Sequence, residues 1–165
     1  MSIADTARNI YTLATNSRVQ VASGVQVDLE IWYAKNITGN ASNVVTVTWN
    51  KSTNSSGLVV LQYSGADTVN PFEGATTGAT TGTSVTSNGF SPAASGNVDV
   101  AGGWDAVQGT LAAGANYKVE AVESSSTALN GEDRLNAPAG AQTASISDSG
   151  NAGNIVIAVA SFRHK

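Results

Sequence analysis

The chain of 165 residues contains no cysteine, a single histidine and few charged side chains. Without cysteine there can be no disulfide framework, no thiolate metal site and no cysteine nucleophile. The one imidazole, His164, lies beside the C-terminus, where chains usually fray, so histidine catalysis is not expected. With 8 Lys and Arg against 12 Asp and Glu, the net charge is −4, and no cationic surface is available to bind the phosphates of a nucleic acid.

Long apolar runs are also missing. No run of about 18 apolar residues is present, so we expect no membrane span. The first eight residues contain no apolar core of the kind found in secretory signals, so we expect no signal peptide in this chain. Such a protein is used in the cytoplasm, assembled there into a particle, or cut from a longer secreted precursor. We expect it to act extracellularly, at a cell surface or in a virion.

The residues that are abundant favour β-structure. Thr, Val and the aromatic residues suit half-buried pleated strands, whereas the 17 glycines and the many Asn and Ser residues suit tight turns. Apolar and polar residues alternate with a period of two, which predicts strands over residues 27–33, 43–49, 57–63, 117–121 and 155–162. The segment 57–63 is apolar on both faces and is predicted to be a central strand. The fold class is therefore all-β.

The two halves of the sequence resemble one another, and this internal repeat is the basis of the predicted architecture. Residues 57–64 align with residues 154–161 at an offset that also takes Thr46 to Thr143. We expect half-repeats over 1–67 and 96–165, joined by a crossover over 68–95 with one weak strand near residues 83–86. Each half presents one apolar sheet face, so the pair should close into a two-layer antiparallel β-sandwich, a single domain over 1–165. The alternative is that two β-rich stretches align through alternation alone.

Several segments resemble recurrent parts of jelly-roll, or concanavalin-like, modules found in large secreted bacterial surface proteins and in some phage structural proteins. The resemblance covers most of the chain and rests on the order of residues 5–13, 30–37, 62–67 and 132–134. It implies a jelly-roll sandwich with no characterised catalytic residues. In such modules each half opens with an apolar strand. The second half offers residues 96–104 for it, but only eight residues precede Asn9, so the first half is expected to lack its opening strand.

A missing strand would leave an open sheet edge, and such an edge recruits another strand. Residues 1–8 or 68–95 could fold back to fill it, a neighbouring chain could donate a strand, or the edge could reflect a truncation. We expect donation, and hence self-association as an oligomer or polymer. The predicted assembly edge comprises Ile3, Tyr11, Val98 and Val100.

Two further sites are predicted. Trp32, if exposed beside Asp28 and Glu30, could stack on a sugar ring together with Trp104. The preferred alternative is that Trp32 packs beneath the crossover loop or at a subunit contact. Asp67, Glu132 and Asp133 supply carboxylate oxygens for a structural calcium ion, although no segment has the spacing of a twelve-residue calcium loop. No other cofactor is expected.

The sequence therefore favours a structural protein and argues against an enzyme. The first hypothesis is a non-catalytic subunit of an extracellular surface, fibre or virion that associates through sheet edges. The second is a carbohydrate-binding or adhesive module that uses exposed tryptophan. The third is a glycosidase or lyase that uses the carboxylates Asp28 and Glu30, which lie about 7 Å apart on one strand face. Such charges are ordinary on the polar face of a half-buried strand.

Overall fold

A computed structural model describes residues 1–21, 26–107, 109–123, 128–150 and 152–165. All regular secondary structure in these residues is β, as predicted, and they contain no helix that is long and apolar enough to cross a membrane. The strands are β1 (Ser2–Asp5), β2 (Tyr11–Leu13), β3 (Val19–Val21), β4 (Val27–Leu29), β5 (Trp32–Ala34), β6 (Val45–Thr48), β7 (Phe72–Gly82), β8 (Ser84–Thr86), β9 (Asn97–Asp105), β10 (Leu111–Ala113), β11 (Lys118–Glu123), β12 (Ala128–Ala137), β13 (Ser145–Asp148) and β14 (Gly153–Phe162).

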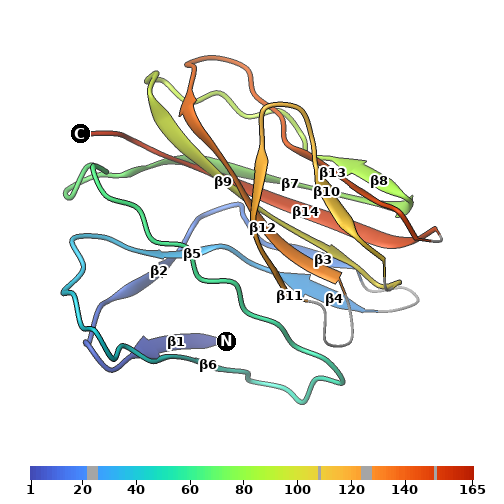
Figure 1. Ribbon diagram of the computed structural model, residues 1–165, viewed down its shortest axis with the longest axis horizontal. Helices are drawn as coiled ribbons and strands as arrows, with labels where there is room; N and C mark the ends of the chain where they lie inside the picture. The colour runs from blue at the N-terminus through green and yellow to red at the C-terminus, as the bar shows by residue number, and fades with distance from the viewer. Residues whose placement is uncertain (22–25, 108, 124–127, 151) are drawn as a thin grey trace.

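The main core lies between two antiparallel sheets formed by β7–β14 (Figure 1). One sheet has five strands in the order β11-β12-β9-β14-β7, and the other has three in the order β10-β13-β8. Ile155, Ile157 and Val159 of β14 pack against Val85 of β8 and Ile146 of β13 across the interface. The predicted strand over 155–162 is confirmed as β14, and it is central because it pairs with both β7 and β9.

Residues 1–48 add three separate two-stranded sheets, which we call the N-terminal ribbons: β1-β6, β2-β5 and β3-β4. They lie on the other side of the five-stranded sheet (Figure 1), and the ribbon β3-β4 contacts β7, β9 and β14. Aromatic packing holds β5 to the sheet, because the ring of Tyr33 lies 5.7 Å from that of Phe72 and 5.3 Å from that of Phe162. The ribbons therefore cover the outer face of the sheet without joining its hydrogen-bond ladder.

Three predictions about strands are wrong. The segment 57–63 is in no strand, and it covers the outer face of the five-stranded sheet. The segment 27–33 is interrupted between β4 and β5, where the backbone of Ile31 bonds to Ser17 Oγ and to the amide of Ala14. The first half does have an opening strand, because β1 pairs with β6 from Ser2 opposite Thr48 to Asp5 opposite Val45.

The crossover over 68–95 holds two strands, where the sequence predicted one. β8 confirms the weak strand near residues 83–86, but β7 pairs with β14 along most of its length. β7 consists largely of Gly, Ala and Thr, because it lies very close to its neighbour: a Cβ atom on Gly78 would be 2.4 Å from the carbonyl oxygen of Thr86. Small residues here mark close backbone packing, so a strand with almost no bulky side chain still belongs to the sheet.

Candidate functional site

Residues 57–63, which we call the unpaired segment, form the most unusual feature of the surface. Exposure alternates along them as it does in a strand, with the side chains of Val59, Leu61 and Tyr63 turned inward. A Cβ atom on Gly131 of β12 would lie 2.6 Å from Val59 Cγ1, so this segment packs directly on the outer face of the sheet. The hydroxyl of Tyr63 anchors its end by donating a hydrogen bond of 2.8 Å to Asp133 Oδ2.

The backbone of the unpaired segment is not part of the hydrogen-bond ladder of any sheet in the described ranges. Within the described ranges, no backbone hydrogen bond joins residues 58–62 to any other residue. Two of the three outward side chains are apolar, with Leu58 45% exposed and Val60 59% exposed, and the third is Gln62. A strand-like segment with free peptide groups and apolar outward side chains presents what a partner strand needs.

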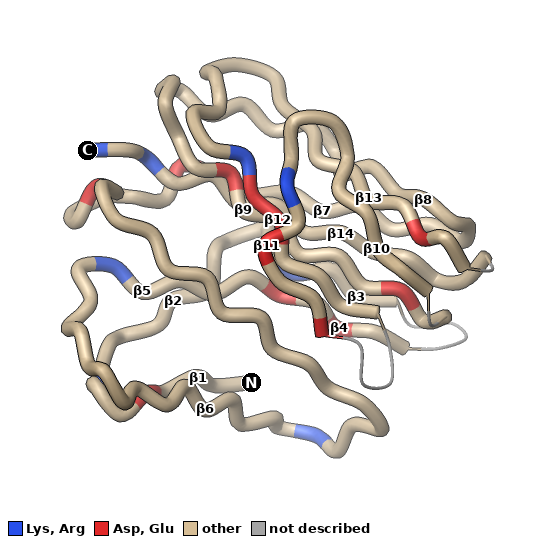
Figure 2. The backbone as a smooth tube through the Cα atoms, in the orientation of Figure 1, with Lys and Arg blue, Asp and Glu red and all other residues tan. Residues whose placement is uncertain are grey.

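Residues 1–71 are rich in exposed apolar side chains. Nine large hydrophobic residues are exposed in the described part of the chain, and seven of them lie in residues 1–71: Ile10, Ile37, Val44, Trp49, Leu58, Val60 and Val69. We call these seven the N-terminal apolar surface. Lys51 is the one charged residue between Asn36 and Ala66, and Figure 2 shows how sparse charge is over the N-terminal ribbons.

A cavity of about 560 Å³ lies beneath the unpaired segment, between the N-terminal ribbons and the five-stranded sheet. Apolar side chains from both sides line much of it, including Ile3, Val45 and Val47 from β1 and β6 and Val98 and Val100 from β9. The ribbons and the sheet are therefore not closely packed against one another here.

The predicted assembly edge is only partly an edge. β9 pairs with β12 on one side and with β14 on the other, so Val98 and Val100 are in a central strand and line the cavity. Ile3 pairs with Val47 in the ribbon β1-β6 and also faces the cavity. Tyr11 pairs with Ala34 and donates a hydrogen bond of 3.0 Å from its hydroxyl to Asp5 Oδ2. The prediction of an edge at β9 is wrong because β12 covers it.

The predicted sugar site is partly assembled, but its polar groups already have partners. Asp28, Glu30 and Trp32 line the cavity, whereas Trp104 of β9 is not among the lining residues. The indole nitrogen of Trp32 donates to Glu30 Oε2 at 2.7 Å, so Trp32 is half-buried and its polar group is bonded. Arg18 donates through Nε to Asp28 Oδ1 at 3.0 Å and forms an ion pair of 2.9 Å with Glu30 Oε1.

The three predicted calcium ligands are not brought together. Asp67 accepts hydrogen bonds from the amides of Val69 and Asn70 in its own loop. Glu132 and Asp133 occupy successive positions of β12 and so project to opposite faces of the sheet. Within the described ranges, no three acidic, histidine or cysteine side chains are grouped so that they could hold a metal ion.

The inner face of β9 and β12 carries buried acidic residues, of which the sequence analysis singled out Glu132 but not Asp99 or Asp105. Asp99 and Asp105 of β9 are fully buried, as is Glu132 of β12. Burial raises the pKa of Asp99 and Asp105 and raises the pKa of Glu132 to about 8. The polar residues of β9 point into the core, whereas the valines Val98 and Val100 face the cavity.

Comparisons with known proteins assign no family. No family model and no curated protein matches the chain. A solved structure, the tripod (BppUct-A-L) from the baseplate of bacteriophage Tuc2009, is similar with a TM-score of 0.34 and 12% sequence identity. The match covers 78% of this chain and 84% of that chain. A likeness of this size establishes neither a shared fold nor a shared function, so the function is argued from the chain's own residues.

Proposed function

We propose that this chain is a non-catalytic structural subunit that associates with copies of itself by strand pairing at the unpaired segment. The observation that carries the proposal is that residues 58–62 have a strand-like alternation of exposure but no backbone hydrogen bond within the described ranges. Free peptide groups on an apolar segment are satisfied best by another strand, and main-chain pairing gives affinity without charged anchors.

The composition around the unpaired segment supports this proposal. Proteins that keep a sheet edge from pairing place lysine, proline or an inward charge on it. Residues 58–62 are Leu, Val, Val, Leu and Gln, so none of these protective residues is present. The N-terminal apolar surface would be buried in the same contact, and burial of apolar area stabilises association by roughly 25 cal/mol per Å² before the entropic cost of binding is subtracted.

The architecture and location we propose follow the resemblance of the sequence to jelly-roll modules. In this proposal, β7–β14 form a β-sandwich of the jelly-roll type, and the N-terminal ribbons form the layer through which copies meet. The assembled protein would belong to an extracellular surface, a fibre or a virion. Glycan binding lacks comparable support, because Arg18, Glu30 and Trp32 bond to one another and leave few free polar groups for a sugar.

Sedimentation velocity over a range of protein concentrations tests the proposal. We expect the weight-average mass to rise with concentration, from one chain to dimers and larger species, because each subunit supplies an unpaired segment. Negative-stain images of the concentrated sample should then show particles or filaments of regular width. A mass that stays at one chain up to the solubility limit would overturn the proposal.

A further inference from the structure

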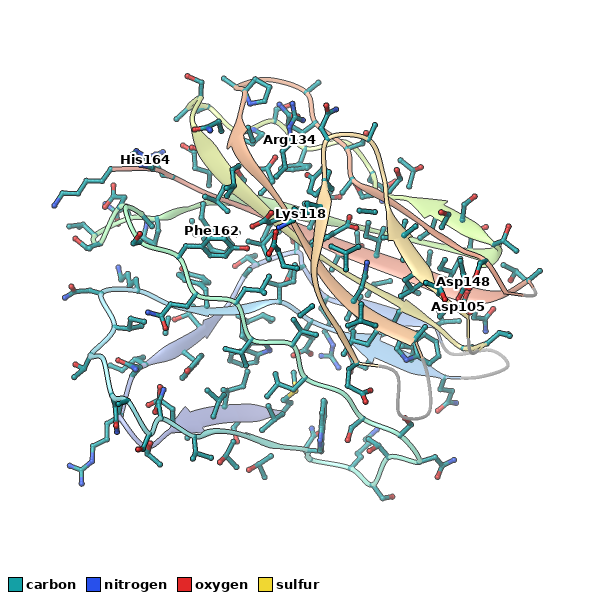
Figure 3. The ribbon with its side chains drawn as sticks, viewed as in Figure 1. Asp105, Lys118, Arg134, Asp148, Phe162 and His164 are labelled. Carbon is teal, nitrogen blue, oxygen red and sulfur yellow. The ribbon has the colours of Figure 1, made fainter. Side chains whose placement is uncertain are left out.

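One strand of the five-stranded sheet and one strand of the three-stranded sheet each end in an aspartate, and the two aspartates lie at the same end of the core. Asp105 is the last residue of β9 and Asp148 is the last residue of β13. Figure 3 shows the two side chains next to each other, although they come from different sheets. Asp105 is 0% exposed and Asp148 is 6% exposed, so two neighbouring carboxyl groups are both buried.

Each carboxyl group is held by its own loop in the same way. Asp105 Oδ1 accepts a hydrogen bond of 2.9 Å from the amide of Val107, and Asp148 Oδ1 accepts one of 2.7 Å from the amide of Gly150. The other oxygen of each, Oδ2, is buried and accepts no hydrogen bond from a donor in the described part of the chain, and the two carboxyl groups lie within hydrogen-bonding reach of one another. Both unpartnered oxygens therefore belong to carboxyl groups whose orientation is already fixed.

Glycine residues lie very close to the carboxyl groups of Asp105 and Asp148. A Cβ atom on Gly109 would lie 1.7 Å from Asp148 Oδ1, and one on Gly153 would lie 2.7 Å from Asp105 Oδ1. The ion pairs of the described residues join Arg18, Lys118 and Arg163 to other acids, so no lysine or arginine among them neutralises Asp105 or Asp148. Two buried like charges without a cation are costly, so at this place either one carboxyl group keeps a proton, as the raised pKa of Asp105 allows, or a cation is held by both.

We propose that Asp105 and Asp148 bind one calcium ion through their Oδ2 atoms. Carboxylate, carbonyl and water oxygens are the ligands that calcium prefers, and it takes about six to eight of them in flexible geometry. Within the described ranges, no histidine or cysteine side chain that would select a softer metal is grouped with the two aspartates. The ion would tie the end of β9 to the end of β13 and so join the two sheets. This inference is independent of self-association, since the site lies away from the unpaired segment.

Calorimetric titration of chelator-treated protein with calcium chloride tests the site at neutral pH. We expect one ion to bind per chain and the melting temperature to rise by about 5 °C at a calcium concentration well above the dissociation constant. Asp105→Asn and Asp148→Asn should each weaken binding at least tenfold and abolish the melting shift. Asp67→Asn, which alters a half-buried carboxylate in a different loop, should leave both unchanged.

A measurement on the unmodified protein tests the site even if an Asn variant does not fold. In ¹⁵N spectra, calcium should shift the amide signals of Val107 and Gly150, because these amides bond to the proposed ligands. The inference is overturned by the absence of binding heat and melting shift in the unmodified protein, as expected if the two carboxyl groups only share a proton. Binding that both Asn variants retain, or that leaves the two amide signals unmoved, also overturns it, since the ion would then sit elsewhere.

Discussion

Replacing Val60 with lysine should keep the protein as a single chain at concentrations where the unmodified protein assembles. The side chain of Val60 is 59% exposed and points away from the sheet, so lysine can extend into solvent without disturbing the subunit. In an assembled state, however, a paired strand would cover this position and strip water from the ammonium group. We expect the dissociation constant to rise by about tenfold or more, as measured by sedimentation velocity.

Leu135→Lys provides the matched control. Leu135 is also 59% exposed, but it lies in β12, outside the N-terminal apolar surface. The same gain of charge there should leave the association constant unchanged. If the two lysine variants weaken association equally, the effect would not depend on the position of the lysine, and the unpaired segment would not be the contact.

Replacing Glu132 with glutamine should stabilise the subunit by about 3 kcal/mol at pH 7. Glu132 is fully buried, and burial raises its pKa to about 8 from the ordinary 4.5. Below pH 4.5 the carboxyl group is protonated in both the folded and the unfolded chain, so the shift has no effect. As the pH rises from there towards 8, only the unfolded chain ionises, and stability falls by about 1.4 kcal/mol per pH unit on account of this group.

Glutamine has nearly the shape of the protonated acid and cannot ionise, so this loss of stability should vanish in the variant. Chemical unfolding at pH 5, 6, 7 and 8 measures it as the difference in the free energy of unfolding between the two proteins. Glu120→Gln is the control. Its carboxylate lies at the surface beside Lys118, at 2.7 Å, and an exposed pair of this kind contributes roughly 0–1 kcal/mol. A difference between Glu132→Gln and the unmodified protein that does not grow with pH would contradict the account.

Periodicity predicted some of the strands, namely β6, β11 and β14, and it failed where close backbone contact or a local bond decided the structure. β14 and β11 follow from alternation and apolar content. β7 does not, because its Gly, Ala and Thr residues reflect the close approach of Gly78 to Thr86, which is a contact between distant residues. The break between β4 and β5 depends on Ser17, which is 14 residues from Ile31, so the alternating pattern of 27–33 gives no sign of it.

The candidate site, like the fold, could be predicted only in part from the sequence. The apolar character of residues 57–63 was visible in the sequence, but a central strand and an unpaired surface strand have the same pattern, and only the surrounding ladder distinguishes them. Val98 and Val100 were assigned to an open edge, but β9 is paired on both sides, and its buried face carries the acids Asp99 and Asp105. The pairing of Asp105 with Asp148 joins two sheets, so no local spacing in the sequence indicates it.

Hydrogen exchange at the amides of residues 58–62, measured by mass spectrometry in dilute and in concentrated protein, tests the central claim most directly. If another copy pairs with the unpaired segment, these amides should exchange at nearly the unprotected rate in dilute protein and should become strongly protected in the assembled state. Amides of β14 should be protected equally in both conditions, because β14 is paired on both sides within one subunit. Exchange at 58–62 that stays fast in the assembled protein would contradict strand pairing at this segment.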